Sequence, residues 1–363
     1  MSKIHSNSIS AKYLLPLLKD ITHASSMDLE AWDVTIRLAR QAKLLGLISW
    51  RLNDRAELWE QLPRQVRGHL QSAINFSNHR KQMVRFELDA ISKALPQNLS
   101  VILLKGAAYI LQDCEFARGR LPNDVDLLVS STDLPEAEAA LMASGWETET
   151  LDAYDQNYYR NWSHELPPMR YPGHALEVDL HHTITPVTSR VRSNTDLLFK
   201  NLRPIADSRY FALHPHDQIV HASIHLFQDS ALIGGLRDIV DLDAMIRTCA
   251  IDPVASNELL LRAKLHGAER YVWYAMHFCH AWLNTPIPDE MVAIQPSRLT
   301  TSLMDAIFSN GSLPSIQNGK AKPALFAASL SGSIRYHWLR MPPKLLARHI
   351  GHKCLRIFSK KVF

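Results

Sequence analysis

The sequence predicts an α+β fold, in which a small mixed β-sheet is flanked by N- and C-terminal helical regions. Residues 1–97 carry apolar side chains at helical spacing and few Gly or Pro residues. Short apolar runs then alternate with helical segments across residues 98–200, as in a sheet with connecting helices. The helical period returns in residues 201–308. We expect a linker and a basic tail over residues 309–363.

The N-terminal helical region is expected to end in a long helix that follows Pro63. Its predicted buried side includes Val66, Leu70 and Phe86. A Pro-Gln-Asn segment then interrupts the helical pattern, and the period of the apolar residues changes after it. This change places the start of the sheet-forming region near residue 98.

The central region contains several short segments that predict strands. Residues 100–105 form an apolar run rich in strand formers, and a helix is expected from Gly106 onward. Residues 124–129 predict a second strand. Residues 169–171 and 175–181 predict a strand pair joined by a Pro-Gly turn. The order of these segments favours a sheet over a helical bundle.

The composition excludes several classes of protein. Hydrophobic residues make up 46% and charged residues 21% of the 363 residues, which excludes a disordered chain, a collagen-like chain and a disulfide scaffold. The longest apolar runs are too short to span a bilayer, and the N-terminal residues lack the apolar core of a signal peptide. The four cysteines form no CxxC pair, so reduced thiols and a cytoplasmic location are expected.

Charge is distributed unevenly along the chain. No Asp or Glu follows Asp305, whereas ten basic residues lie between Lys320 and Lys361. The tail therefore carries +10 and the remainder −6, giving the net charge of +4. Such a tail indicates an anionic partner, either nucleic acid or the inner face of a membrane, where the protein would bind peripherally. A solvated tail, or a helix docked on the protein's own body, explains the same pattern.

A group of acidic residues carries the strongest functional signal. Asp124 and Asp126 are two residues apart on a predicted strand, so both side chains point to one face, about 7 Å apart along the strand. Two carboxylates so placed repel each other unless a cation lies between them, and Mg²⁺ or Mn²⁺ suits their hard oxygen ligands. Glu177 and Asp179 lie on a later strand, and either could supply a third carboxylate. A third carboxylate would allow two metal ions to act in an in-line displacement at phosphorus.

Residues suited to phosphate binding precede the acidic pair. Gly106 lies between a strand and a helix, where backbone N–H groups can approach phosphates, and Lys105 could neutralise a triphosphate. Arg118 and Arg120 could do the same for a leaving pyrophosphate. Arg120 is the stronger candidate nucleotide-binding residue, with a solvated loop arginine as the alternative.

The segments ILLKGAAYIL, RLPNDVDLLV and LEVDLHHTI together resemble a bacterial family of uncharacterised nucleotidyltransferases within the polymerase-beta-like superfamily. The resemblance covers roughly residues 30–250. It implies that Asp124 and Asp126 bind metal, that Asp179 is the third carboxylate and that Gly106 contacts the nucleotide phosphates. The superfamily usually has Ser after the glycine, whereas this chain has Ala107, so one phosphate-binding hydroxyl is missing.

This resemblance implies an ATP- or other NTP-dependent, metal-dependent enzyme of the EC 2.7.7 class that moves an NMP from an NTP to an acceptor. Residues 98–200 would form its catalytic core, and residues 201–308 would lie on the acceptor side. The acceptor is open: a small molecule, a glycan, a peptide or RNA. A non-catalytic nucleotide- or partner-binding module and a phosphotransferase are the alternative functions. The sequence does not indicate an oligomeric state.

The histidines allow a different interpretation. His221, His225 and Asp229 recur at intervals of four residues on one helical face, a spacing that can bind zinc. No HExxH pattern and no cysteine pair accompany them. We therefore favour hydrogen bonding between helices for these residues, or a place for His225 in the acceptor pocket. One residue of the pair His181 and His182 could also lie near the acceptor, because the pair follows the third acidic strand.

Overall fold

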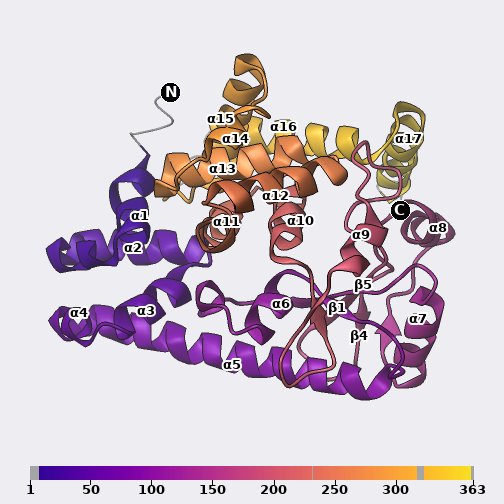
Figure 1. The fold of residues 1–363 in the computed structure, drawn as a ribbon, viewed down its shortest axis with the longest axis horizontal. Coiled ribbons are helices and arrows are strands. Elements are labelled where there is room, and N and C mark those ends of the chain that lie inside the picture. The colour runs from indigo at the N-terminus through magenta and orange to yellow at the C-terminus, as the bar shows by residue number, and fades with distance from the viewer. Residues whose placement is uncertain (1–7, 231, 317–322, 361–363) are drawn as a thin grey trace.

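A seven-stranded mixed sheet lies in the middle of the molecule, with helices from both ends of the chain around it (Figure 1). The structure, a computed structural model, describes residues 8–230, 232–316 and 323–360. This architecture confirms the predicted α+β class with helical flanks. Within the described residues, no helix is both long enough and apolar enough to cross a membrane.

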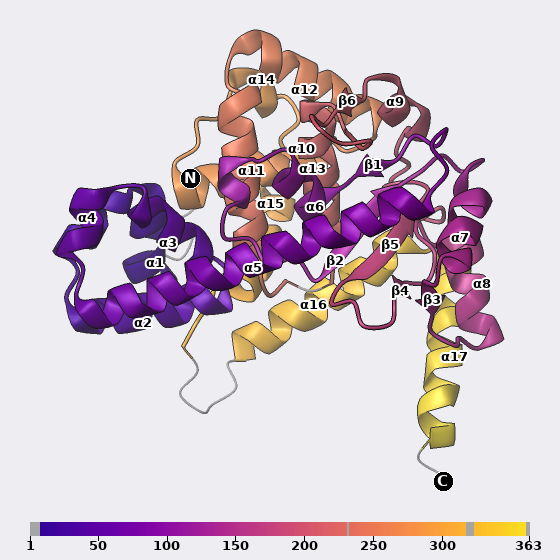
Figure 2. The ribbon, with the colours of Figure 1, turned by 90° about the horizontal axis from the view of Figure 1, so that it is seen from below.

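The N-terminal region is helical, as predicted, and α5 crosses beneath the sheet (Figure 2). Helix α5 follows Pro63 and packs against β2, α6 and α7 through its buried side. Phe86 was expected on that side, but its side chain is 61% exposed. Its ring packs edge-on against the ring of His174, with 5.0 Å between the ring centroids. The elements of this region are α1 (Ile9–Lys19), η1 (Ile21–Ser26), α2 (Leu29–Gln41), α3 (Leu45–Asn53), α4 (Ala56–Gln61) and α5 (Arg64–Ala94).

The strands are short and follow the order β3-β4-β5-β2-β1-β7-β6 across the sheet. The predicted strands within residues 100–105, 124–129 and 175–181 are all present as β1, β2 and β5. Two further strands, β6 and β7, extend the sheet beyond residue 200. The strands are β1 (Ile102–Leu103), β2 (Asp124–Leu128), β3 (Glu147–Thr148), β4 (Met169–Arg170), β5 (Glu177–His181), β6 (Arg203–Pro204) and β7 (Phe211–Ala212).

The pairing of β2 with β5 sets the geometry of the acidic residues. The two strands are parallel neighbours, with Asp126 opposite Asp179 and Asp124 opposite Glu177. Because side chains alternate along a strand, the residues between them point to the other face, where they are fully buried. One face of the strand pair is therefore acidic and the other belongs to the apolar core.

Shorter helices connect the strands, and helix α6 begins immediately after β1, as predicted for the Lys105-Gly106 turn. Helix α7 packs against β5 and α5. Capping is local for two of these helices, since Asp152 and Asn194 accept hydrogen bonds from the first turns of α8 and α9. The connecting helices are α6 (Lys105–Leu111), η2 (Glu115–Ala117), α7 (Leu134–Ala143), α8 (Ala153–Trp162) and α9 (Thr195–Lys200).

The C-terminal helices form a bundle on the opposite side of the molecule from α5 (Figure 1). Helices α10, α11 and α13 pack against one another, and α16 packs against α15 and α10. The expected linker overlaps the last turn of α15 and includes residues 317–322, which lie outside the described residues. The helices are α10 (Pro215–Gln228), α11 (Gly235–Cys249), α12 (Pro253–Leu265), α13 (Glu269–Leu283), α14 (Asp289–Val292), α15 (Arg298–Ser312), α16 (Pro323–Arg340) and α17 (Pro343–Lys360).

Candidate functional site

Asp126 is the most buried carboxylate of the acidic face and is held by two cationic side chains. It is 2% exposed, and its Oδ1 accepts hydrogen bonds from Lys105 Nζ at 2.7 Å and from His181 Nε2 at 3.1 Å. Burial alone would raise the pKa of Asp126, but Lys105 and His181 hold it well below the usual range. Asp126 is therefore a carboxylate at every physiological pH.

Lys105 is positioned by the backbone between β1 and α6. Its φ of +44° is unusual for a residue with a side chain, and strain of this kind is found at functional sites. The neighbouring Leu104 N–H donates to the carbonyl of Asp126 at 3.0 Å, which fixes the turn against β2. Burial lowers the pKa of Lys105, but the charge of Asp126 outweighs this effect and the net shift is upward. The ammonium thus stays charged beside the acidic strand pair.

Asp179 and Glu177 occupy different environments on β5. Glu177 accepts a hydrogen bond from Arg170 at 2.6 Å and its side chain is 45% exposed. Asp179 lies opposite Asp126, and its buried Oδ1 has no hydrogen-bond partner among the described residues. Burial and the charge of Asp126 raise the pKa of Asp179 to about 7. Asp179 is thus the carboxylate of β5 whose charge is not balanced by an ion pair among the described residues.

Asp124 lies at the start of β2 and lines the same cleft as Asp179. Burial and the charge of Asp126 raise its pKa. The ligand atoms of Asp126, Asp179 and His181 lie within 4.8 Å of one another, whereas Asp124 belongs to none of the metal-compatible groups among the described residues. The three predicted aspartates therefore share one face, and Asp126 and Asp179 lie directly opposite each other on it.

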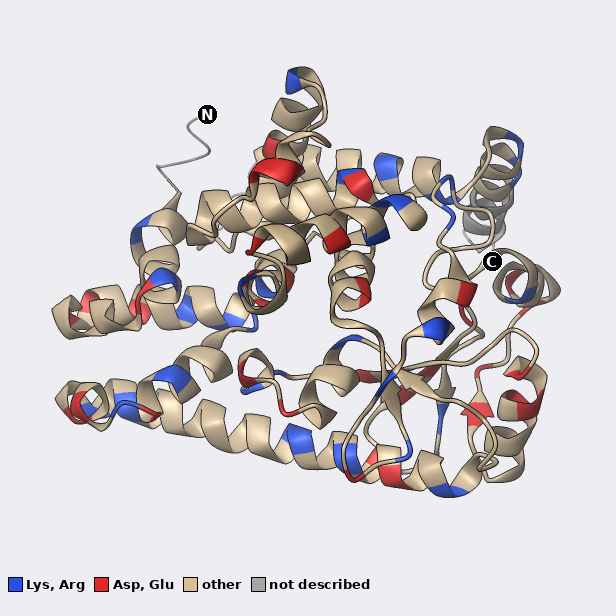
Figure 3. Cartoon of the chain, viewed as in Figure 1, with Lys and Arg blue, Asp and Glu red and all other residues tan. Residues whose placement is uncertain are grey.

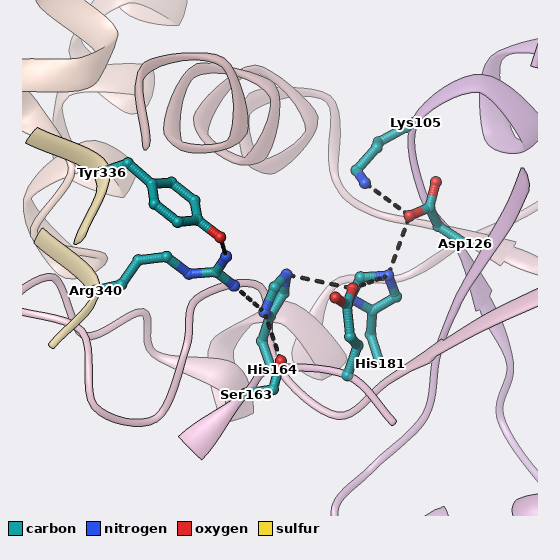
Figure 4. A network of polar contacts seen from close by, with 8 residues as sticks. Lys105, Asp126, Ser163, His164, His181, Tyr336 and Arg340 are labelled. Carbon is teal, nitrogen blue, oxygen red and sulfur yellow. Dashed lines mark hydrogen bonds and ion pairs between the residues drawn. The ribbon is translucent and has the colours of Figure 1, made fainter. Parts of the chain in front are cut away.

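A chain of polar contacts connects Asp126 to the C-terminal helix α16 (Figure 4). His181 Nε2 lies 3.5 Å from Glu165 Oε2, which is also 3.5 Å from His164 Nε2. His164 Nδ1 then contacts the guanidinium of Arg340 at 3.2 Å, and Arg340 also bonds to the Tyr336 hydroxyl. Residues from the start of α6, from β2 and β5, from the segment after α8 and from α16 thus meet in one network.

This network borders a cleft of about 250 Å³. The wall of the cleft carries both positively and negatively charged side chains. Such a wall suits a substrate that is anionic and that also binds through a metal ion. The charged and hydrogen-bonding residues that line it are Lys105, Asp124, His164, Glu165, Asp179, His225, Gln228, Asp229, Tyr336 and Arg340.

Of these residues, the sequence analysis missed His164, Glu165, Gln228, Tyr336 and Arg340. His181 was only a candidate for the acceptor side, but the structure bonds it to Asp126. Because His181 follows Asp179 by two residues on the same strand, strand alternation would have predicted that both side chains point to one face. Arg340 is 176 residues from His164, and no local pattern connects them.

The histidines of α10 lie close to the site and are neutral. Burial, followed by the charge of Lys105, lowers the pKa of His221 to about 3. Lys105, followed by burial, lowers the pKa of His225 well below its usual range. His225 lines the cleft, and neither histidine belongs to a metal-compatible group among the described residues. Their arrangement gives no support to zinc binding by His221, His225 and Asp229.

Arg120 and Gly106 lie behind the cleft wall. Arg120 forms ion pairs with Asp241 and, at 3.7 Å, with Asp238, both on α11. A Cβ atom at Gly106 would lie 3.1 Å from Arg120 Nε, so the glycine leaves room for the arginine. Arg118 pairs with Asp54 at 2.5 Å. None of the three lines the cleft, and their predicted contacts with phosphates stay predictions.

A comparison with protein families matches residues 28–284 to the family described as uncharacterised nucleotidyltransferase. The match covers more than two-thirds of the 363 residues and includes both acidic strands. The chain belongs to this family. Membership in this nucleotidyltransferase family indicates a transferase and implies an NTP substrate. Comparisons with curated proteins and with solved structures gave no significant match.

The matched region ends before α14, so Tyr336 and Arg340 come from a segment outside it. Among the residues that the structure describes, the groups that could hold a metal ion all lie within the matched region. The carboxylates of Asp126 and Asp179 offer hard oxygen ligands, and the Oδ1 of Asp179 is buried without a partner among the described residues. This donor set suits Mg²⁺ or Mn²⁺.

The charge repulsion between Asp126 and Asp179 predicts that the free energy of unfolding of the metal-free protein depends on pH. Folding raises the pKa of Asp179 from 3.8 to about 7, so the folded state binds the extra proton and loses stability as the pH rises through this window. Asp179→Asn removes this penalty. We expect the variant to be more stable than the wild type by about 1–2 kcal/mol at about pH 8 in EDTA, with no difference near pH 4.

Urea unfolding at both pH values measures this effect. Glu177→Gln is the matched control on the same strand, because its exposed carboxylate is already paired, and we expect it to change stability by less than about 0.5 kcal/mol. A lower stability of Asp179→Asn at about pH 8 would contradict the assigned repulsion.

Proposed function

We propose that the protein transfers a nucleoside monophosphate from an NTP to an acceptor hydroxyl or phosphate, with release of pyrophosphate. One observation carries the proposal: Asp126 and Asp179 lie opposite each other on parallel strands, beside Lys105, at a cleft. Unpaired charge of this kind is costly to bury, and a cation-dependent reaction gives it a use. The family membership favours the same reaction class.

The proposed reaction is one in-line displacement at the α-phosphorus. An acceptor oxygen forms a new bond to this phosphorus, and the bond to the oxygen that bridges the α- and β-phosphates breaks, so both electrons leave with pyrophosphate. Asp179 takes the proton of an acceptor hydroxyl, since it lines the cleft and its Oδ1 has no hydrogen-bond partner among the described residues. Divalent cations held by Asp124, Asp126 and Asp179 would neutralise the phosphate charge and lower the pKa of the acceptor.

Two cationic side chains of the cleft suit the triphosphate. Lys105 projects from the β1–α6 turn, and Arg340 projects from α16 on the other side of the network (Figure 4). Among the described residues, the Arg340 guanidinium bonds to the side chains of His164 and Tyr336 and forms no direct ion pair with a carboxylate. We assign Arg340 to substrate phosphates, and Arg120 to supporting the Gly106 turn from behind. The acceptor is a small molecule, glycan, peptide or RNA.

Removal of the central carboxylate tests the proposed chemistry. We expect Asp126→Asn to lower pyrophosphate release from labelled NTPs with Mg²⁺ by at least about 10³-fold, because several kcal/mol of charge stabilisation are lost. Glu177→Gln should stay within about twofold of the wild type, since Arg170 already pairs with its carboxylate. NTP binding that depends neither on metal nor on Asp126 refutes the site. A nucleoside diphosphate product instead of pyrophosphate identifies a phosphotransferase.

The assignment of Arg340 predicts a selective loss of NTP affinity. We expect Arg340→Gln to raise the KM for NTP by about tenfold or more, the equivalent of one charge-assisted hydrogen bond, and Arg340→Lys to restore part of it. Arg120→Gln should instead lower the free energy of unfolding, because it removes one of the two ion pairs of the buried Asp241 and leaves only the pair with Arg237. Equal KM values for Arg340→Gln and the wild type would remove Arg340 from the nucleotide site.

A second proposal concerns the exposed side of α16. Four large apolar residues recur there at intervals of four, so they form one continuous stripe, and each is 49–70% exposed. They are Phe326, Leu330, Ile334 and Trp338. The opposite side is docked, with Ala328 and Gly332 buried. The stripe is thus a largely exposed apolar face, with the Arg190 guanidinium packed over the ring of Trp338 at one end.

Basic residues extend this face into α17. Lys344 and Arg348 are exposed, and no acidic residue follows Asp305 anywhere in the sequence (Figure 3). Apolar side chains with a Trp next to basic residues suit the boundary between lipid headgroups and acyl chains. An RNA partner would leave the aliphatic side chains exposed. We propose that α16 and α17 bind the surface of an anionic membrane.

Vesicle binding tests the proposed membrane surface. We expect stronger binding to phosphatidylcholine vesicles with about one-third phosphatidylglycerol than to phosphatidylcholine alone, and weaker binding at high salt. Leu330→Ser with Ile334→Ser should reduce the partition coefficient by about tenfold or more, since two large apolar side chains are lost. Leu261→Ser with Leu265→Ser, at the same spacing on α12 and similarly exposed, should leave it within about twofold.

A failure to bind anionic vesicles, or an equal loss in the α12 control, overturns the membrane proposal. Self-association of the protein that the Leu330/Ile334 variant abolishes would assign the stripe to a second copy of the chain instead.

A further inference from the structure

Two histidines and a glutamate form a compact group outside the cleft. His214 immediately precedes α10, His216 lies in its first turn, and Glu258 lies on the neighbouring helix α12. Their ligand atoms lie within 4.8 Å of one another. The group lines none of the cleft described above, and the proposed reaction does not use it.

The distances within this group are too long for hydrogen bonds. Glu258 Oε1 lies 3.6 Å from His214 Nε2, and Glu258 Oε2 lies 3.5 Å from His216 Nδ1. Ligand atoms about 2.0–2.1 Å from a tetrahedral metal ion are themselves roughly 3.4 Å apart. The spacing of these donors therefore matches ligands around one ion better than a directly hydrogen-bonded trio.

Hydrogen bonding presents one histidine as a ligand. His216 is 5% exposed, and its Nε2 donates to the Cys249 carbonyl at 2.7 Å in the neutral tautomer that satisfies this contact. Its Nδ1 then carries a lone pair directed at Glu258, and this buried atom has no hydrogen-bond partner among the described residues. A backbone carbonyl that fixes the second nitrogen is the usual support of a metal-bound histidine.

The charged groups around the trio include Arg262, which lies on the same helix as Glu258. The other charged groups around the trio are Asp217, which pairs with Arg262 at 3.0 Å, and Glu258 itself. The Glu258 carboxylate faces one histidine ring with each of its oxygens.

We propose that His214, His216 and Glu258 bind a Zn²⁺ ion. Two imidazoles and one carboxylate form a three-ligand set that zinc accepts, with a fourth position for water or a further ligand. The ion would tie the start of α10 to α12. Because α10 also carries His225 into the cleft, this tie would stabilise the helix that forms one wall of the site.

Metal titration of the full-length protein tests the proposed site. After EDTA treatment and dialysis, we expect one equivalent of Co²⁺ to give the visible absorption of a four-coordinate ion, and Zn²⁺ to displace it and raise the Tm. His214→Ala and Glu258→Gln should each weaken Zn²⁺ binding by at least about 100-fold. Both side chains lie nearer the surface than His216, so the variants are expected to fold.

Two controls separate this site from others. His79→Ala removes an exposed histidine of α5 and should bind Zn²⁺ as the wild type does. Asp126→Asn should also retain this equivalent, so the result is independent of the proposed transferase activity. Unchanged Zn²⁺ affinity in His214→Ala and Glu258→Gln, or no binding by the wild type, would overturn the proposal.

Discussion

The pairing of Asp126 with Asp179 across two parallel strands is the constraint on which the rest of the site depends. Backbone register places the carboxylates side by side, and the core on the opposite face of the strands prevents a one-residue shift that would separate them from the cleft. Lys105 and His181 compensate Asp126, whereas Asp179 keeps a buried oxygen without a partner among the described residues. The protein thus maintains an incomplete charge balance at the cleft, which a divalent cation and a polyphosphate would complete.

Helix α16 links this constraint to the part of the chain beyond the family match. Its end is held by the loop after β5, where the Arg190 N–H donates to the Leu339 carbonyl at 3.0 Å and the Thr188 hydroxyl donates to the Arg340 carbonyl at 2.7 Å. This attachment brings Arg340 to the network of His164 and leaves the apolar stripe on the outer side. One helix therefore contributes both to the wall of the cleft and to the surface proposed to meet lipid.

Local patterns sufficed for the fold class and for the central acidic residues. The period of two predicted that Asp124 and Asp126 share one face of β2 and that Glu177 and Asp179 share one face of β5, because alternation is a property of the strand backbone. The choice of Asp179 over Glu177 came from the family resemblance. Long-range partners could not be predicted in this way. Arg120 was expected at phosphates, but its side chain meets Asp241 on a helix that follows more than a hundred residues later. Phe86 has helical spacing, yet only tertiary packing decides that its ring stays exposed. Arg340 reaches the cleft only because α16 packs where its guanidinium contacts His164, a contact that no local sequence pattern predicts.

The most direct test of the central claim is a crystal structure with Mn²⁺ and a non-hydrolysable NTP, with anomalous scattering used to locate the metal. We predict an anomalous peak from Mn²⁺ at coordination distance from the carboxylates of Asp126 and Asp179, with the triphosphate beside Lys105. Metal and triphosphate bound elsewhere, with Asp126 still engaged only by Lys105 and His181, would contradict it.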